Sequence, residues 1–455
     1  MRSENVSTKQ TRIAALARSN PKMVLTSLNH HLDIEWLRHA YNLTRKDGAT
    51  GIDGQTAQDY EKDLEANLTS LLDRIKSGRY KAPPVRRTHI PKADGSTRPL
   101  GIPTFEDKVA QRAIALLLVP IYEMDFHPFS YGFRPGRSPH QALYEIRNQI
   151  MDCKIRWVLD VDIRRYFDTI NHRQLREFLD RRVADGVVRR MIDKWLKAGV
   201  LESGQISHSE MGTPQGGVIS PLLANIFLHH VLDEWFQRDV RPRMKRRCFL
   251  VRYADDLVMG FEDFLDCIRV REVLGKRLSA YGLSLHPEKT KMVDFRFKRP
   301  DGRRHPATQA TTFNFLGFIH VWGKSRQGKN VVYQRTAKDR FARALKTIKD
   351  WCRANRHLSM KVQRARLSQK MTGHYSYYGI TGNGRRIRWF AHKVQRIWHY
   401  WLGRRSRGSQ SRWKRFDRLL STYPLPKPRI VHQYAGASEP AARGTGCGKS
   451  ARPGL

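Results

Sequence analysis

The stretch Arg156-Trp-Val-Leu-Asp-Val-Asp-Ile-Arg-Arg-Tyr-Phe-Asp-Thr-Ile170 places two acids inside a strongly apolar run. Its first half predicts a β-strand, and because side chains alternate across a strand, Asp160 and Asp162 should share one face. The opposite face should carry the apolar side chains of Leu159, Val161 and Ile163. This strand therefore predicts a packed core on one side and an acidic surface on the other.

A second acidic pair lies in Cys248-Phe-Leu-Val-Arg-Tyr-Ala-Asp-Asp-Leu-Val-Met-Gly-Phe261. Two apolar runs around Asp255 and Asp256 predict a β-hairpin with both carboxylates at its turn. A single Asp-Asp pair is usually a turn or a cap, but the two strands together favour a metal site. Acids crowded in an apolar setting repel each other, and a pair of Mg²⁺ ions would relieve that repulsion. Such a site is typical of phosphoryl transfer by a polymerase or nuclease.

The charge of the chain also indicates a nucleic-acid partner. Among 455 residues, 84 Lys and Arg against 42 Asp and Glu give a net charge of +42, which favours binding to a polyanion. Residues 335–455 hold 29 basic and 4 acidic residues, a net charge of +25, so the other 334 residues carry only +17. The 40% hydrophobic content is enough for a folded core and argues against a merely disordered basic tail.

Other features exclude some classes of protein. The longest apolar run, Ala113 to Ile121, is too short to span a bilayer and is interrupted by Pro120, and the N-terminal residues have no signal-peptide pattern. These features predict a cytoplasmic protein. The five cysteines form no CxxC pair, which argues against a structural zinc site.

The acidic stretches resemble the palm of a reverse transcriptase. From about residue 20 to 400, the motifs and their order resemble one family, the bacterial group II intron-encoded reverse transcriptase/maturases. The motifs are Gly48-Ala-Thr-Gly-Ile-Asp-Gly54, Ile90-Pro-Lys-Ala-Asp-Gly-Ser-Thr-Arg-Pro-Leu-Gly-Ile-Pro-Thr104, Ser130-Tyr-Gly-Phe-Arg-Pro-Gly-Arg137, Gly212-Thr-Pro-Gln-Gly-Gly-Val-Ile-Ser-Pro-Leu-Leu-Ala-Asn225, Tyr253-Ala-Asp-Asp256, Pro287-Glu-Lys-Thr290 and Phe315-Leu-Gly317.

The resemblance implies an α+β right-hand polymerase with fingers, palm and thumb. The expected parts are fingers and an N-terminal extension at 1–155, with part of the palm in 81–125, and the palm with its catalytic motifs at 156–322. A helical, basic thumb or maturase (X) domain should follow at 330–403, and a basic, partly disordered tail at 404–455. The stretch Gly323 to Lys329 is the expected join, and the zinc-supported HNH endonuclease of many family members has no counterpart here.

The same resemblance implies the catalytic residues. Asp162 and Asp255 would be the principal ligands of two Mg²⁺ ions, with Asp256 beside them and the Ile163 carbonyl as a further ligand. Asp160 would be structural. Lys289 is the candidate for protonating the departing pyrophosphate.

Five residues are implied to bind the incoming dNTP: Lys92, Arg98, Phe167, Gln215 and Gly216. Lys92 and Arg98 flank an Asp-Gly turn and would close over the triphosphate. The ring of Phe167 would clash with a 2′-hydroxyl and so select dNTPs over rNTPs. After the glycine-rich turn, Ser220 is expected to cap a helix that begins with Pro221.

Arginines of the C-terminal region are expected to contact RNA or DNA, namely Arg385, Arg386, Arg388, Arg404, Arg405 and Arg407. The implied partners are a group II intron RNA, an RNA template with a DNA primer, a DNA target and dNTPs, without a membrane. Two alternatives remain: a splicing-only RNA-binding maturase, and a reverse transcriptase of a retron, diversity-generating or defence system. The sequence leaves the oligomeric state open.

Overall fold

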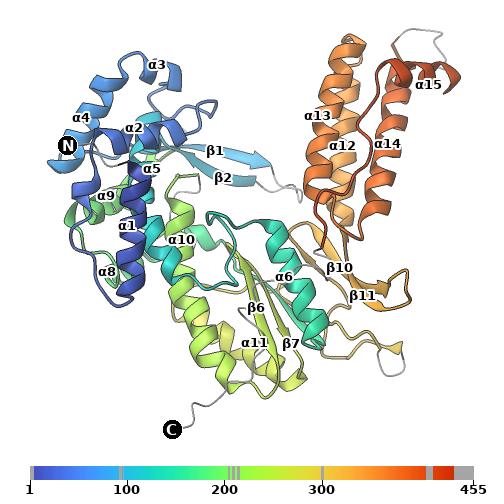
Figure 1. The fold of residues 1–455 in the computed structure, drawn as a ribbon, viewed down its shortest axis with the longest axis horizontal. Coiled ribbons are helices and arrows are strands. Elements are labelled where there is room, and N and C mark those ends of the chain that lie inside the picture. Colours follow the sequence, from blue (N-terminus) through green and yellow to red (C-terminus); the bar gives the residue numbers. More distant parts are fainter. Residues whose placement is uncertain are drawn as a thin grey trace.

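A computed structural model describes residues 5–91, 95, 97–202, 205–207, 211–212, 216–298, 302–405 and 413–434. Helices and sheets are mixed throughout this part of the chain, and Figure 1 shows three regions: an N-terminal helical region, a central sheet, and an upright helical bundle. The mixture of helix and strand agrees with the α+β prediction.

The N-terminal region is built around one long buried helix. Its helices are α1 (Val6–Ser19), α2 (Ile34–Leu43), α3 (Ala57–Glu61), α4 (Leu64–Lys76) and α5 (Phe105–Asp125). The buried Trp36 of α2 donates a hydrogen bond from Nε1 to the Ala113 carbonyl of α5, 3.0 Å away. Pro120 of the apolar run lies inside α5 and does not end the helix. Burial of the apolar side chains around it, including Leu117 and Ile121, outweighs the lost backbone hydrogen bond.

A hairpin projects from this region toward the helical bundle (Figure 1). Strands β1 (Val85–Pro91) and β2 (Thr97–Ile102) pair antiparallel. The sheet is completed by β4 (Val200–Glu202), which pairs parallel with β1, and by β5 (Gln205–Ser207).

The central sheet has the order β6-β7-β3-β8 and is antiparallel throughout. Its strands are β3 (Trp157–Asp162), β6 (Cys248–Tyr253), β7 (Asp256–Phe261) and β8 (Lys291–Asp294). One face packs into the larger core, with Leu159, Val161 and Ile163 as expected from the alternation. The opposite face buries Val158 in a second core under α6 (Pro139–Asp152), so only its end is left to the acids.

The helices of the larger core lie between these strands in the sequence. They are α7 (Tyr166–Thr169), α8 (His172–Asp180), α9 (Gly186–Lys197), α10 (Ser220–Leu228) and α11 (Phe264–Ser279). Two π-helical turns, His229–Asp233 and Phe236–Val240, extend α10. Such turns are rare and often accompany functional sites.

A third sheet joins the central sheet to the bundle. It consists of β9 (Phe313–Phe315), β10 (Phe318–Lys324) and β11 (Asn330–Thr336). Residues 323–329, the expected join between domains, comprise the last two residues of β10 and the turn that leads to β11, and the two strands pair along seven residues each. The sheet is therefore continuous across that stretch.

The bundle contains α12 (Lys338–Ala354), α13 (Met360–Tyr378), α14 (Gly384–Leu402) and the shorter α15 (Trp413–Thr422). Phe341, Ile348 and Cys352 of α12 enter its apolar core at helical spacing. Within the described residues, no helix is long and apolar enough to cross a membrane.

The segment after α15 returns along the bundle to the sheets. The Val431 amide donates to the Gly379 carbonyl (2.7 Å), and the Tyr434 hydroxyl donates to Gln334 of β11 (2.7 Å). The His432 ring stacks on His140 of α6 with their centres 3.5 Å apart. Residues 413–434 of the expected partly disordered tail therefore form a helix and a strap, whereas residues 435–455 lie outside the described part.

Candidate active site

The carboxylates predicted to act together meet at one end of the central sheet. Asp162 is the last residue of β3 and lies directly opposite Asp256, the first residue of β7. Asp255 occupies the tight turn between β6 and β7, so the predicted hairpin is confirmed. Asp160, Asp162 and Asp256 line an open cleft whose other wall is formed by Arg340, Tyr377 and Tyr378 of the bundle.

Burial and mutual repulsion disfavour the charged forms of three of these acids. Burial raises the pKa of Asp255. The pKa of Asp256 is raised to about 6, first by loss of surrounding water and then by repulsion from Asp255 and Asp162. Part of the Asp256 surface nevertheless faces solvent. The pKa of Asp160 rises to about 7, mainly through burial and then the charge of Asp256, with Lys291 opposing. Divalent cations would relieve these costs, so the donor set fits Mg²⁺.

The turn that carries Asp255 is held from behind by a buried arginine. Arg252 and Asp233 are both fully buried and form an ion pair through Arg252 Nε and Nη2, with an Nε–Oδ1 distance of 2.8 Å. Nη1 of Arg252 also donates to Asn225 Oδ1 (2.8 Å) and to the Ala254 carbonyl (3.0 Å). Ala254 has a φ of 57°, a left-handed conformation that needs such support. Arg252 therefore fixes the residue immediately before Asp255.

Sequence reasoning missed this network. Asp233 and Asn225 lie 19 and 27 residues before Arg252, on the helical side of the sheet, and no local pattern connects them. The one signal in the sequence was Arg252 itself, because a charged residue at an inward position of an apolar strand indicates a buried partner.

A loop from the Ser130–Arg137 motif packs against the same turn. The Tyr131 amide donates to the Arg252 carbonyl (2.8 Å), and Asn225 Nδ2 donates to the Gly132 carbonyl (2.7 Å). A Cβ on Gly132 would lie 2.3 Å from the Ala254 nitrogen, so only glycine allows this approach. The loop thus supports the turn in addition to Arg252.

Lys289, the candidate proton donor, lies beside the acids. Its Nζ lies 3.5 Å from Asp162 Oδ2, and both side chains are partly exposed. The Asp162 carbonyl accepts a hydrogen bond from the His286 amide (2.8 Å), and Ile163 pairs with Leu285. The segment before β8 therefore lies directly beside the end of β3.

Residues predicted to bind the nucleotide come from three elements. Arg98 lies on β2, and its positive charge acts on both Asp255 and Asp256. Phe167 is buried in α7. Gly216 has a φ of 115°, and a Cβ there would lie 2.6 Å from the Gly101 carbonyl of β2. Lys92 and Gln215 lie outside the described residues.

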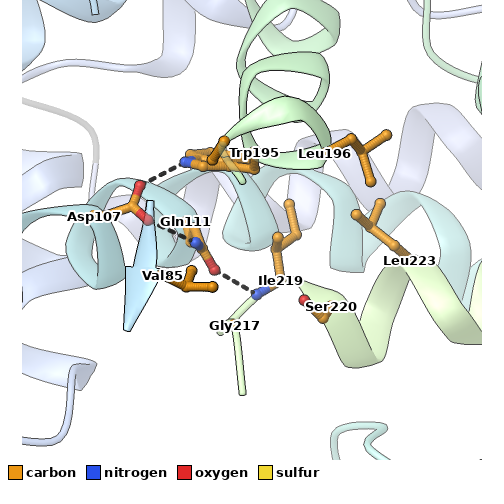
Figure 2. A pocket seen from close by; sticks show the side chains of 10 residues that line it. Val85, Asp107, Gln111, Trp195, Leu196, Gly217, Ile219, Ser220 and Leu223 are labelled. Carbon is orange, nitrogen blue, oxygen red and sulfur yellow. Dashed lines mark hydrogen bonds between the residues drawn. The ribbon is translucent and has the colours of Figure 1, made fainter. Parts of the chain in front are cut away.

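The glycine-containing loop is anchored by a buried network that the sequence did not reveal (Figure 2). Asp107 of α5 accepts hydrogen bonds from Tyr80 and from Trp195 of α9, both at 2.6 Å, and from Gln111 at 3.0 Å. Gln111 in turn accepts from the Ile219 amide at 3.3 Å. Burial raises the pKa of Asp107 to about 6. The network fixes the residue just before α10.

One helix boundary differs from its prediction. Helix α10 begins at Ser220, and Ile219 is its N-cap residue, so the expected capping role of Ser220 is wrong. The amide of Ile219 is held by Gln111, which sets the start of the helix one residue earlier. Pro221 lies in the first turn, as expected.

The C-terminal arginines fall into two separate groups. Arg385, Arg386 and Arg388, at the start of α14, line a broad groove together with Lys324, Arg326, Arg335, Arg147 and the half-exposed Trp389. Among the residues that the structure describes, no acid lines this groove. Arg404 and Arg405 lie about 30 Å away at the other end of the 19-residue helix. Arg405 Nη2 donates to the His357 and Leu358 carbonyls, and Arg407 lies outside the described residues.

The sheet, its turn of acids and the cleft in front of them bring together the carboxylates expected to hold the metal ions of a polymerase. The sequence pattern of the family "Reverse transcriptase (RNA-dependent DNA polymerase)" matches residues 90–320, about half of the chain, and this range includes all four acids. The chain belongs to the reverse transcriptase family.

Its relatives include proteins encoded by introns. Protein YkfC of Escherichia coli (strain K12) is 34% identical over 359 residues, which cover 71% of this chain and 90% of that protein. The group II intron-encoded protein LtrA of Lactococcus lactis subsp. cremoris is 39% identical over 225 residues, 48% of this chain but only 37% of LtrA. The nuclear intron maturase 4, mitochondrial, of Arabidopsis thaliana is 25% identical over 209 residues, 46% of this chain and 25% of that protein.

Proposed function

We propose that this reverse transcriptase copies a group II intron RNA into DNA and also binds that RNA to assist splicing and mobility. The observation that carries the polymerase function is the meeting of Asp162, Asp255 and Asp256 at one sheet end, with pKa values raised at two of them. Two Mg²⁺ ions bound by these acids and the Ile163 carbonyl would supply the positive charge that phosphoryl transfer requires.

The chain's own residues would orient the reactants. Arg98 would draw the triphosphate toward the acids, and its charge already acts on Asp255 and Asp256. Phe167 would select the sugar, and Gly216, with Lys92 and Gln215, would complete the dNTP site. Lys289, 3.5 Å from Asp162, would donate a proton to the leaving pyrophosphate.

The architecture fits a right-hand polymerase with the parts expected above: fingers at 1–155, palm at 156–322, thumb or maturase domain at 330–403 and tail at 404–455. The β1–β2 hairpin projecting toward the bundle and the cleft between acids and bundle support this assignment. The template with its primer would lie in that cleft. We place the protein in the cytoplasm, at the nucleoid when it acts on a DNA target.

We assign the groove at the start of α14 to RNA. Its cations, Arg385, Arg386 and Arg388 among them, suit phosphates, and Trp389 offers an exposed ring for an unstacked base. The guanidinium of Arg386 lies 5.3 Å from the centre of that ring and keeps it in place. The groove shares no lining residue with the acidic cleft, so RNA could occupy it during polymerisation.

The main alternative is an RNA-binding splicing factor that does not polymerise. A pure binder gains nothing from holding three acids together at the expense of raised pKa values, so the acid cluster favours the polymerase. A reverse transcriptase of a retron, diversity-generating or defence system is disfavoured by the similarity to intron-encoded proteins.

Primer extension on an RNA template tests the polymerase function. The wild type should extend a DNA primer with dNTPs and Mg²⁺ far better than with rNTPs, and Asp255→Ala should abolish extension. Asp239→Ala, an exposed acid paired with Arg243, is the matched control and should extend normally. No extension by the wild type would favour the binder, and extension by Asp255→Ala would overturn the metal-site assignment.

Filter binding tests the RNA groove. Because each lost phosphate contact lowers the slope of log affinity against log salt by about 0.7 for a single strand, Arg385→Ala/Arg388→Ala should lower it by about 1.4. Arg173→Ala removes an exposed arginine on α8, outside the groove, and should leave the slope unchanged. An unchanged slope in the double variant would refute the groove.

A further inference from the structure

Phe133 is displayed on the surface in an unfavourable backbone conformation. It has an exposed fraction of 59%, the largest among the large apolar side chains of the described residues. Its φ of 57° is left-handed, which is uncommon for a bulky aromatic residue. An exposed ring contributes nothing to the core, so the energetic cost of the strained backbone at Phe133 must be offset by its surroundings.

Both neighbours of Phe133 are fixed by the protein. Arg134 is buried; its Nε and Nη2 bond Glu123 at 2.9–3.2 Å, and its Nη1 donates to the His127 and Ser130 carbonyls. On the other side, Gly132 lies against Ala254 and is held by Asn225. The backbone on both sides of Phe133 is therefore fixed, and the Phe133 ring projects from it toward solvent.

The support places Phe133 next to the acidic turn. Its ring centre is 6.5 Å from that of Tyr253, at an interplanar angle of 44°. Tyr253 lies two residues before Asp255 and is half-buried. Arg137, exposed four residues after Phe133, adds a positive charge to the same loop.

We propose that Phe133 and Tyr253 form an aromatic step that contacts the base pair at the primer 3′ end. The 3′-hydroxyl must reach the acids for transfer, so the last base pair must lie beside the residues that flank the turn. An aromatic ring contacts any base or sugar through its face, which suits a polymerase that copies every sequence. Arg137 would bind a neighbouring phosphate. This assignment of Phe133 rests on the polymerase function proposed above.

The test measures binding of primer–template separately from catalysis. Fluorescence anisotropy with a labelled RNA–DNA primer–template, without nucleotide, should show affinity about 5- to 150-fold weaker for Phe133→Ala than for the wild type. Phe133→Trp should restore most of the affinity. In extension assays, KM for primer–template should rise while KM for dNTP stays within twofold.

Phe297→Ala is the matched control. Phe297 is also an exposed phenylalanine (36%), but it follows the end of β8 that lies away from the acids, so its replacement should leave primer–template affinity unchanged. Thermal unfolding of Phe133→Ala should match the wild type because the lost ring is exposed.

The outcomes separate the two proposals. If the wild type extends primers but Phe133→Ala binds primer–template like Phe297→Ala, the aromatic step is refuted and the polymerase stands. If the wild type binds primer–template without extending it and Phe133→Ala weakens binding, the contact stands and the polymerase function fails. A loss of thermal stability that Phe133→Trp restores without restoring affinity would also refute the contact.

Discussion

Replacing Arg252 with methionine should both destabilise the protein and disable the acidic turn. The change leaves the Asp233 carboxylate fully buried without its partner, and removing one member of a buried ion pair costs about 3–5 kcal/mol of unfolding free energy. It also removes the donor to the Ala254 carbonyl, which frees the residue before Asp255. Since a misplacement of about 1 Å at a reactive centre costs about 100-fold in rate, primer extension should fall by that order.

A second variant separates stability from positioning. In Arg252→Met/Asp233→Leu both charges are gone, and apolar replacement of a buried pair is often neutral, so urea unfolding should approach that of the wild type. Extension should stay low, because Ala254 still lacks its donor. Arg173→Met, which breaks the exposed pair with Glu177, should cost less than about 1 kcal/mol.

Two results would refute this reasoning. A loss below about 1 kcal/mol in Arg252→Met would show that the buried pair does not stabilise the sheet. Full extension by the stable double variant would show that the bond to Ala254 does not position Asp255.

Three further predictions concern other parts of the molecule. Gly132→Ala should lower extension at least tenfold with dNTP and primer present, because its Cβ would lie 2.3 Å from the Ala254 nitrogen; normal turnover would disprove this contact. Asp107 has a pKa raised to about 6, so its neutral form is favoured by folding, and stability from this group is gained as the pH falls through 6. The unfolding free energy of wild type minus that of Asp107→Asn should therefore rise by about 2 kcal/mol from pH 8 to pH 4 in urea titrations, and a constant difference would contradict it. If six to ten phosphates are bound, RNA affinity should drop about 10³- to 10⁵-fold between 50 and 200 mM salt in filter binding, and a shallow dependence would contradict the nucleic-acid role of the +42 charge.

Local periodicity was sufficient to predict the acidic strand and hairpin. Alternation along β3 assigned Asp160 and Asp162 to one face, and the two apolar runs around Asp255 specified the turn. These features depend on neighbours within a few residues, which a sequence displays directly.

The supporting structure depends on distant partners and was not predictable. Asp233 holds Arg252 from 19 residues away, and Asp107 holds Trp195 from 88 residues away. Pro120 within α5 shows the same limit, because burial by other helices overrode a local helix-breaking signal. The strap at 424–434 has no periodic pattern, since its order comes from hydrogen bonds to α13 and β11.

The strap has a mechanical consequence for the whole enzyme. The bundle is tied to the sheets where the chain enters it, through Asn383 bonding Thr336 at 2.8 and 3.1 Å, and again where the chain leaves it, through Tyr434 on Gln334. A body tied at two points to one strand resists hinging, so the bundle and the sheet of β9, β10 and β11 should move together. In the polymerase function proposed above, opening and closing between nucleotide additions would then be left to the β1–β2 hairpin, and the product duplex would slide along a wall of constant shape.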